Sequence, residues 1–261
     1  MQLACCQFDI AWEDKPANYR RVQGLLRGAK LDPGTLLLLP EMFATGFSMN
    51  VERTAEPPDG PTVRFLTELA ATHRLHVIGG VAIADPLRGG RPCNEAVAVD
   101  PSGKVVKRYA KVYPFSPGTE DRHYAAGSEP VDFDWSGCRV APTVCYDLRF
   151  PELFRRAMAR TDRCVELMTV IANWPVARIE HWATLLRARA IENQTFVAGC
   201  NRVGKDPALT YNGRSQIIDP GGKVLADAGS EETVIRAEMD LASLREYRRK
   251  LPFLSDMRLG V

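Results

Sequence analysis

The sequence predicts an α/β fold in which two mixed β-sheets lie between outer layers of helices. Apolar runs of strand length alternate with amphipathic runs of helix length, which is typical of strands covered by helices. Two segments break this alternation in the same way, because each has an Asp-Pro-(Ser/Gly)-Gly-Lys-Val turn between two apolar runs. Pro and Gly at these positions favour a tight turn between antiparallel strands, so each half of the chain is expected to close with a hairpin.

The expected elements follow in order. Strand, helix, buried strand, helix and strand are predicted, from their apolar periodicity, over QLACCQFDI (2–10), NYRRVQGLLRGA (18–29), TLLLLP (35–40), TVRFLTELAATHR (62–74) and HVIGGVAI (76–83), followed by the hairpin AVAVDPSGKVVKRY (96–109). The second half gives a strand ending near Cys145, an amphipathic helix after it, then strand CVELMTVIA (164–172), helix RIEHWATLLRARAIENQ (178–194), strand TFVAGCNRV (195–203) and the hairpin SQIIDPGGKVLADA (215–228).

Composition excludes several classes of function. Basic and acidic residues number 34 and 32 and are scattered, so the net charge of +2 gives no footprint for nucleic acid or for a membrane surface. No apolar run approaches the roughly 18 residues of a membrane span, and the first residues lack the pattern of a secretory signal. The seven cysteines include no CxxC pair, and the four histidines never approach a cysteine at metal-ligand spacing. We therefore expect a cytoplasmic protein with reduced thiols, no metal and no cofactor.

No Ser/Gly-rich linker divides the chain. We expect one domain over residues 1–240 and a C-terminal segment over residues 241–261, built as a helix followed by an extended tail. The Leu and Phe side chains of this tail are expected to pack either on another subunit or on the parent domain.

Cys145 lies where an apolar run stops and a charged amphipathic run begins, in VAPTVCYDLRFPELFRRAMA. The spacing of Leu153, Phe154, Ala157 and Met158 after it is helical, so the segment predicts a strand, a sharp turn and a helix. Such a turn exposes a side chain near backbone N–H groups, which suits an acyl-transfer nucleophile. The alternative is that Cys145 is a small buried apolar residue.

A carboxylate and an ammonium are further candidates. Glu41 directly follows the apolar run TLLLLP, where it is either a base in a pocket wall or a solvated loop acid. Lys111 lies between Tyr109, Tyr113 and Phe115, whose rings can bury its stem and direct its ammonium into a site, although most lysines have no such role.

The segments LLLLPEMFATGF, KRYAKVYPF and VCYDLRFPELFR, in this order, resemble the three signature motifs of the nitrilase superfamily of carbon-nitrogen hydrolases. The resemblance covers roughly residues 1 to 240 and implies a catalytic triad of Glu41, Lys111 and Cys145. Within the superfamily the chain is similar to the omega-amidase branch, which implies hydrolysis of 2-oxoglutaramate and 2-oxosuccinamate. It also implies an αββα sandwich that pairs as αββααββα in a dimer, and a second glutamate, best matched by Glu120. Tyr113 departs from relatives, which often have His there, and this difference affects only the pocket rim.

The resemblance also implies a mechanism and substrate contacts. Glu41 takes the thiol proton of Cys145, the thiolate attacks the amide carbon, and a thioester forms before water releases the acid. The implied oxyanion donors are the ammonium of Lys111 and the backbone N–H of Tyr146, and Glu120 orients Lys111 or the water. We take as candidates for the substrate pocket the guanidinium and aromatic side chains of Phe43, Arg149, Trp174 and Arg178.

Several alternatives stay open. The chain could be another amidase of the superfamily, acting on deaminated glutathione or N-carbamoyl compounds, or a nitrilase. Cys145 could instead form a thiol-protease-like dyad with His123 or His181. From a different class altogether, the chain could be a catalytically silent dimeric binding protein.

Overall fold

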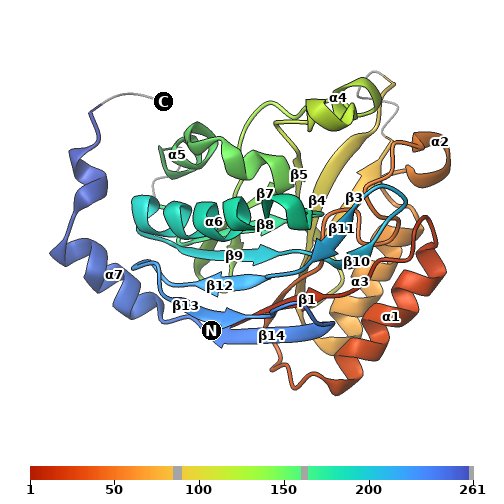
Figure 1. Cartoon of the computed structure of the whole chain (residues 1–261). Helices are drawn as coiled ribbons and strands as arrows, with labels where there is room; N and C mark the ends of the chain where they lie inside the picture. The colour runs from red at the N-terminus through yellow and green to blue at the C-terminus, as the bar shows by residue number, and fades with distance from the viewer. Residues whose placement is uncertain (85–89, 160–163, 259–261) are drawn as a thin grey trace.

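The computed structural model describes residues 1–84, 90–159 and 164–258. Two six-stranded mixed sheets form its centre (Figure 1). The first sheet has the order β14-β1-β2-β3-β4-β5, with strands β1 (Gln2–Gln7), β2 (Leu36–Leu38), β3 (His76–Ile83), β4 (Cys93–Val99), β5 (Val105–Ala110) and β14 (Thr233–Glu238). The second has the order β13-β12-β9-β8-β7-β6, with strands β6 (Phe133–Trp135), β7 (Cys138–Val144), β8 (Leu167–Ile171), β9 (Phe196–Cys200), β12 (Gln216–Ile218) and β13 (Val224–Asp227).

The two sheets are built alike. Three parallel strands, β1-β2-β3 in one and β7-β8-β9 in the other, are each followed by an antiparallel hairpin. These hairpins are β4–β5 and β12–β13, which confirms both predicted turns, and each contains a register shift close to its turn. The sequence did not predict that β14 would pair antiparallel with β1, which joins the two ends of the domain.

Side chains alternate between the two faces of each strand, as period-two geometry requires. In β1, Leu3 and Cys5 point into the core between the sheets, whereas Ala4 and Cys6 point to the outer helices. Val140 and Val144 of β7 face the same central core from the other sheet. The sheets therefore pack face to face.

Helices cover both outer faces. The first sheet is covered by α1 (Lys15–Gly28) and α3 (Pro61–His73), and the second by α5 (Pro151–Ala159) and α6 (Ile179–Asn193) (Figure 1). The Asp14 carboxylate caps α1 by accepting the Ala17 N–H at 3.0 Å, and Pro61 and Pro151 open their helices where no intrahelical N–H bond is needed. The predicted αββα sandwich is confirmed.

Shorter elements connect these layers. They are the helices α2 (Val51–Thr54) and α4 (Glu120–His123), the 3-10 helices η2 (Ser116–Gly118), η3 (Cys145–Arg149) and η4 (Val176–Arg178), and the two-stranded hairpin of β10 (Val203–Lys205) and β11 (Thr210–Asn212). After β14, helix α7 (Leu241–Lys250) packs on the domain through the buried Leu244 and leads to η5 (Phe253–Asp256). Leu251, Phe253 and Met257 of this segment are exposed, and residues 259–261 lie outside the described residues.

The helices in the described ranges include none with the length and apolar character to cross a membrane. The cytoplasmic location stays a prediction.

Candidate active site

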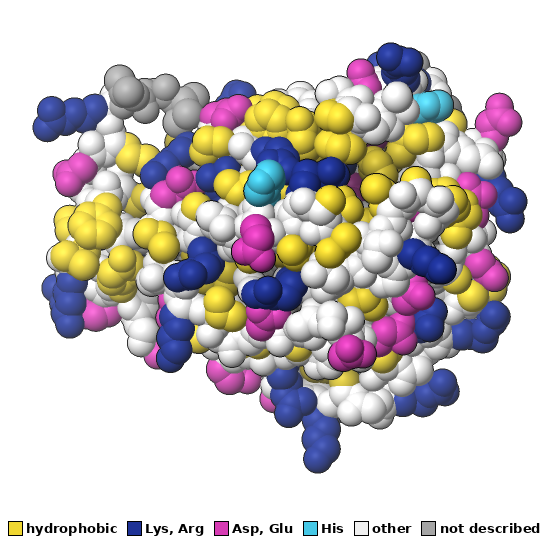
Figure 2. Space-filling model, viewed as in Figure 1, with side chains coloured by type: hydrophobic (Ala, Val, Ile, Leu, Met, Phe, Trp, Pro, Cys, Tyr) yellow, Lys and Arg dark blue, Asp and Glu magenta, His cyan; other side chains and the backbone are white. Residues whose placement is uncertain are grey.

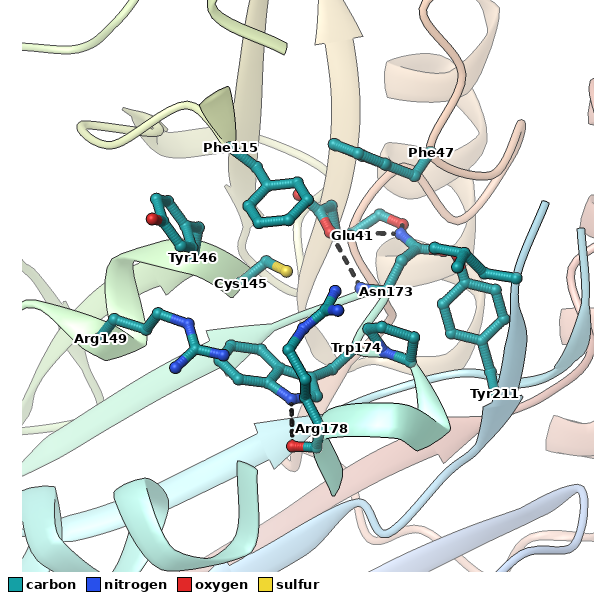
Figure 3. Close-up of a pocket in the computed structure, with 12 residues that line it drawn as sticks. Glu41, Phe47, Phe115, Cys145, Tyr146, Arg149, Asn173, Trp174, Arg178 and Tyr211 are labelled. Atoms are coloured by element: carbon teal, nitrogen blue, oxygen red, sulfur yellow. Dashed lines mark hydrogen bonds between the residues drawn. The ribbon is translucent and has the colours of Figure 1, made fainter. Parts of the chain in front are cut away.

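The predicted triad residues all follow strand ends on one side of the two sheets. Glu41 follows β2, Lys111 follows β5 and Cys145 follows β7. The carboxyl ends of parallel strands meet at one edge of a sheet, where α/β proteins place their ligand sites. Figure 3 shows the Cys145 sulfur on the side that faces Glu41, between Phe115 and Arg178. The structure thus brings together groups that are 70 and 34 positions apart.

Lys111, Glu41 and Glu120 form a buried cluster of charges. The Lys111 ammonium donates to Glu41 Oε1 at 2.9 Å and to Glu120 Oε2 at 2.8 Å, and all three side chains are at most 1% exposed. Glu120 Oε2 also accepts the backbone N–H of Phe115, which fixes the carboxylate in place. Removing Lys111 would leave two buried carboxylates without a counter-charge, which is strongly destabilising. The predicted second glutamate is therefore part of this cluster.

Four N–H contacts surround the Glu41 carboxylate. Oε1 accepts from Lys111 and from Asn94 Nδ2 at 2.7 Å, and Oε2 accepts from the Asn173 backbone N–H at 2.9 Å and its Nδ2 at 3.3 Å. Burial opposes ionisation, but the positive charge of Lys111 and these hydrogen bonds outweigh it and lower the pKa of Glu41. Glu41 is therefore a carboxylate in the resting protein.

The nucleophile candidate is a thiol in the resting protein. Burial, then the negative charge of Glu41, raises the pKa of the Cys145 thiol well above its ordinary value, although Lys111 acts in the opposite direction. Burial would lower the pKa of Lys111, but the charges of Glu120 and Glu41 hold it well above its ordinary value. The site therefore holds a thiol, a carboxylate and an ammonium side by side.

Backbone strain gathers around these residues. Cys145 has φ 49°, Met42 directly after Glu41 has φ 43°, and Thr119 directly before Glu120 has φ 61°. L-residues adopt this left-handed region at a cost of roughly 1–3 kcal/mol, usually where function requires a particular geometry. At Glu41 the chain also passes so close to β3 that a Cβ on Gly80 would lie 2.5 Å from the Glu41 Cα. Only glycine fits there.

The turn that carries Cys145 is held by Asp147. Its Oδ2 accepts the Val144 backbone N–H at 2.9 Å and the Tyr109 hydroxyl at 2.7 Å, and its Oδ1 accepts the Tyr113 backbone N–H at 2.9 Å. Burial raises the pKa of Asp147 to about 6, although these hydrogen bonds act in the opposite direction. Asp147 thereby ties the nucleophile turn to the strand end that carries the lysine.

A cavity opens beside the Cys145 sulfur and has about 400 Å³ of space, its mouth included. Such a volume lies in the range of small-molecule sites, roughly 300–1,000 Å³. The described lining residues are Glu41, Phe47, Phe115, Cys145, Tyr146, Arg149, Asn173, Trp174, Pro175, Arg178, Leu209 and Tyr211. The cavity is therefore apolar over much of its wall, with a carboxylate and a thiol at its inner end.

Arg149 and Arg178 lie at this cavity as predicted, and both are held on aromatic rings. The Arg149 guanidinium lies 4.8 Å from the Trp174 ring centre, and the Arg178 guanidinium lies 5.6 Å from the Phe115 ring centre. Figure 2 shows hydrophobic side chains beside a group of Lys and Arg side chains on the side of α5 and α6. Stacking leaves the guanidinium edges able to donate to an anion.

Phe43 corrects one prediction. It is fully buried among the residues beneath α1 and α3, with ring centres 6.3 Å from Tyr19 and 6.0 Å from Phe65, and it is not among the described residues that line the cavity. The chain reverses at Met42, so Phe43 points to the outer face of the first sheet. Phe47, four residues later, lines the cavity instead.

Other site residues were missed by sequence reasoning. Asn173 is the second residue after β8, one position further from its strand than Cys145 is from β7, and a polar residue so close to a strand end could have identified it. Asn94 lies two residues before the predicted hairpin segment 96–109. A polar residue beside this apolar run was the only sequence signal for it. Tyr211 comes from the β10–β11 hairpin, which has no sequence signal for its position over the cavity.

The two histidines of the alternative dyad do not line the described part of the cavity wall. His123 ends α4, and His181 is exposed on α6 with its Nδ1 3.2 Å from Arg149 Nη2. Across the described ranges, no group of three His, Cys, Asp or Glu side chains is arranged to hold a metal ion. The metal-free mechanism stays a prediction.

Comparison with known proteins identifies the family. The carbon-nitrogen hydrolase family model matches residues 2–249. The chain is 34% identical to a 2-oxoglutaramate amidase of Bacillus subtilis, over 98% of this chain and 97% of the relative. It is 38% identical to an omega-amidase of Escherichia coli, over 98% of this chain and 96% of the relative.

A solved structure is similar throughout. A CN-hydrolase superfamily protein of Xanthomonas campestris, which carries an arsenic adduct in its active site, superposes with a TM-score of 0.93 and is 36% identical. The superposition covers 100% of this chain and 98% of the other. The chain therefore belongs to the carbon-nitrogen hydrolase family, in the nitrilase superfamily, and is a hydrolase that acts on carbon–nitrogen bonds.

Proposed function

We propose that the protein is an amidase that hydrolyses the terminal amide of small 2-oxo acid amides, 2-oxoglutaramate and 2-oxosuccinamate, through a thioester on Cys145. The observation that carries the proposal is the meeting of the Glu41 carboxylate, the Lys111 ammonium and the Cys145 thiol beside one small cavity. Relatives named as a 2-oxoglutaramate amidase and an omega-amidase support the choice of substrate.

The first step is proton transfer coupled to attack. Glu41 is ionised and Cys145 is protonated at rest, and the raised pKa of the thiol together with the lowered pKa of Glu41 makes a free thiolate unfavourable. The thiol therefore gives its proton to Glu41 as sulfur attacks the amide carbon, and the negative charge passes to the carbonyl oxygen. The nucleophile forms only when substrate is present.

Lys111 and the Tyr146 backbone N–H stabilise that oxyanion. An ammonium has three protons, of which two are donated to Glu41 and Glu120, and the third is assigned to the substrate oxygen. Loss of one such donor typically slows the reaction by about 10²–10³-fold. Because Glu120 and Glu41 fix the Nζ atom, this donor is in place before the charge develops.

The second half of the reaction reverses these roles. Protonated Glu41 gives its proton to the leaving nitrogen, the C–N bond breaks, and ammonia departs from a thioester. Glu41 then takes a proton from water as the water oxygen attacks the thioester carbon. It returns this proton to the sulfur as the C–S bond breaks, which releases the carboxylic acid and restores the thiol and the carboxylate. Glu120 orients Lys111 throughout, because one carboxylate oxygen holds the ammonium.

The carboxylate of a 2-oxo acid needs a cationic partner, and Arg149 and Arg178 fill this role. Each is a lining residue of the cavity, and each guanidinium is supported by an aromatic ring. Guanidinium binds carboxylate through two parallel hydrogen bonds, which also fixes the direction of the substrate. Trp174 completes that wall and donates from its Nε1 to the Arg178 carbonyl at 2.8 Å.

Ammonia release from a substrate panel tests the proposal. We expect the highest kcat/KM for 2-oxoglutaramate and 2-oxosuccinamate, above a nitrile, an N-carbamoyl amino acid and deaminated glutathione. Cys145→Ala is expected to lower the rate roughly 10⁴-fold or more, whereas Cys164→Ala, at an exposed thiol, is the matched control and keeps it. Preference for the nitrile or the carbamoyl compound would refute the substrate assignment.

The arginine assignment has its own test. Arg149→Leu and Arg178→Leu are expected to raise KM for 2-oxoglutaramate by roughly 10-fold or more, since each loses a charge-assisted bond. KM for a neutral aliphatic amide should stay the same. Arg20→Leu, on the exposed side of α1, is the control. Equal effects on the charged and the neutral amide would show that the arginines only support the fold.

The two remaining alternatives predict different results. His123→Ala and His181→Ala should keep activity, whereas Lys111→Ala should lose it; the reverse pattern would favour the dyad. A silent binding protein would release no ammonia from any amide. Pairing into a dimer stays a proposal, which light scattering of the purified protein measures, and the exposed Leu251 and Phe253 are candidate contact residues.

A further inference from the structure

We propose that Asn94 is a positioning residue of this centre, whose side-chain amide ties Glu41 to Glu120 and fixes both carboxylates around Lys111. The inference rests on the proposed role of Glu41 as the base and goes beyond it. Asn94 lies outside the three signature segments, and it is not among the described residues that line the cavity.

Asn94 touches every charged member of the cluster. It lies on β4 and is 1% exposed. Its Nδ2 donates to Glu41 Oε1 at 2.7 Å and to Glu120 Oε1 at 2.8 Å, so the two protons of one amide bridge two carboxylates. Its backbone carbonyl accepts the Lys111 N–H at 2.9 Å. One residue therefore sets the distance between the two acids and the start of the lysine side chain.

The orientation of the amide supports a role in holding carboxylates. Among the described residues, Asn94 Oδ1 is buried without a hydrogen-bond partner, a condition that costs free energy in a folded protein. Turning the amide over would place Oδ1 against two carboxylate oxygens, which only accept hydrogen bonds. The unsatisfied oxygen is thus the consequence of directing both N–H groups to Glu41 and Glu120.

The charges explain why such a bridge is needed. Two carboxylates share one ammonium, so the buried cluster has a net charge of −1, and the two acids repel each other. Without the amide, this repulsion is relieved either by protonation of Glu41 or by its rotation away from Lys111. Both changes remove the base from the Cys145 thiol.

The other titratable groups that face Glu41 do not take over this function. Lys111 after β5 and Glu120 in α4 are already bound to the cluster, and Cys145 after β7 is the proton donor itself. The Tyr124 hydroxyl after α4 has a raised pKa, because it is buried, and donates to the Ser48 carbonyl. Asn94 is the neutral donor shared by both acids.

Asn94→Ala tests the inference, with Asn193→Ala as the matched control. Asn193 is also a buried asparagine whose Oδ1 has no partner among the described residues, but it bonds the Arg189 carbonyl on α6. We expect kcat/KM of Asn94→Ala on 2-oxoglutaramate to fall roughly 10–100-fold at pH 7, with the acidic limb of its pH profile moved to higher pH. Asn193→Ala should lose stability and keep the wild-type pH profile.

Alkylation gives a readout that needs no substrate. Iodoacetamide labelling of Cys145 is followed by peptide mass as the pH is lowered. The loss of labelling on the acid side should occur at a higher pH in Asn94→Ala than in the wild type. Labelling of the exposed Cys164 in the same samples should be unchanged. Asn94→Ser, which removes less volume and keeps one donor, is measured as the second variant and should lie between the two.

Two results would overturn the inference. The first is that both Asn94 variants keep the wild-type pH dependence of kcat/KM and of Cys145 labelling. The second is that Asn193→Ala moves these pH profiles as far as Asn94→Ala does. Failure of the wild-type protein to release ammonia from 2-oxoglutaramate would instead refute the proposed substrate. The labelling profiles would still decide the role of Asn94 in that case.

Discussion

Replacing Asp147 by Asn separates the charge of this buried group from its shape. The carboxylate accepts three hydrogen bonds, two on Oδ2 and one on Oδ1. An amide has one acceptor oxygen, so Asp147→Asn keeps the bonds from Val144 and Tyr109 and sets its NH₂ group against the Tyr113 N–H. The lost bond, with its unpaired donor, destabilises the fold by about 1–3 kcal/mol.

The charge itself acts in the opposite direction and depends on pH. Burial raises the pKa of Asp147 from its ordinary 3.8 to about 6, so the folded protein favours the protonated acid. This contribution to stability is fully present below the unfolded pKa and is lost as pH rises through the folded pKa. With pKa values of 3.8 unfolded and about 6 folded, the loss between pH 4 and pH 7 is about 2.4 kcal/mol, and the amide does not undergo it.

Urea unfolding of both proteins from pH 4 to pH 7 measures the difference directly, because the other titrating groups are common to both. We expect Asp147→Asn to be less stable than the wild type at pH 4 and equal to it or more stable at pH 7. Asp147→Asn should also lower kcat, since the nucleophile turn loses its link to Tyr113. A difference in unfolding free energy that stays constant with pH would refute the reasoning about the buried charge.

Three further substitutions test the geometry of the site. Gly80→Ala forces a Cβ against the Glu41 backbone, so the rate of ammonia release should fall roughly 100-fold and the unfolding free energy by about 1–3 kcal/mol. The control Gly24→Ala, on the exposed side of α1, should raise the unfolding free energy by about 0.5–1 kcal/mol. Glu120→Gln should lower kcat roughly 10–100-fold with little change in KM in steady-state assays, and an unchanged kcat would remove Glu120 from the mechanism. Tyr211→Phe removes the 2.6 Å hydrogen bond from the hydroxyl to Asp206, so urea unfolding should show an unfolding free energy lower by about 1 kcal/mol. The kcat/KM should stay within about twofold of the wild type, and a large fall would show that the hydroxyl binds substrate.

Local signals predicted most of the fold. The helices, the hairpins and the parallel strands follow from periodicity and from turn residues, which act over a few positions. The pairing of β14 with β1 was not predicted, because Gln2 and Glu238 are adjacent only after the domain closes. The helix expected after Cys145 begins at Pro151, since the residues between them form a 3-10 turn held by Asp147.

The site was predictable as far as its sequence motifs reached. The three signature segments identified Glu41, Lys111 and Cys145, which the fold brings together. Phe43 was misplaced because proximity in sequence to Glu41 does not determine direction after a left-handed turn at Met42.

The two asparagines were missed for a different reason. Asn94 and Asn173 act through hydrogen bonds to residues 53 and 132 positions away, which no local pattern encodes.

Mass spectrometry of the intact protein, acid-quenched during turnover of 2-oxoglutaramate, tests the central claim most directly. The account predicts a fraction of molecules heavier by the acyl group of the substrate without its nitrogen, with the added mass on the peptide that contains Cys145. Product formation with no acylated protein, together with undiminished activity of Cys145→Ala, would contradict it.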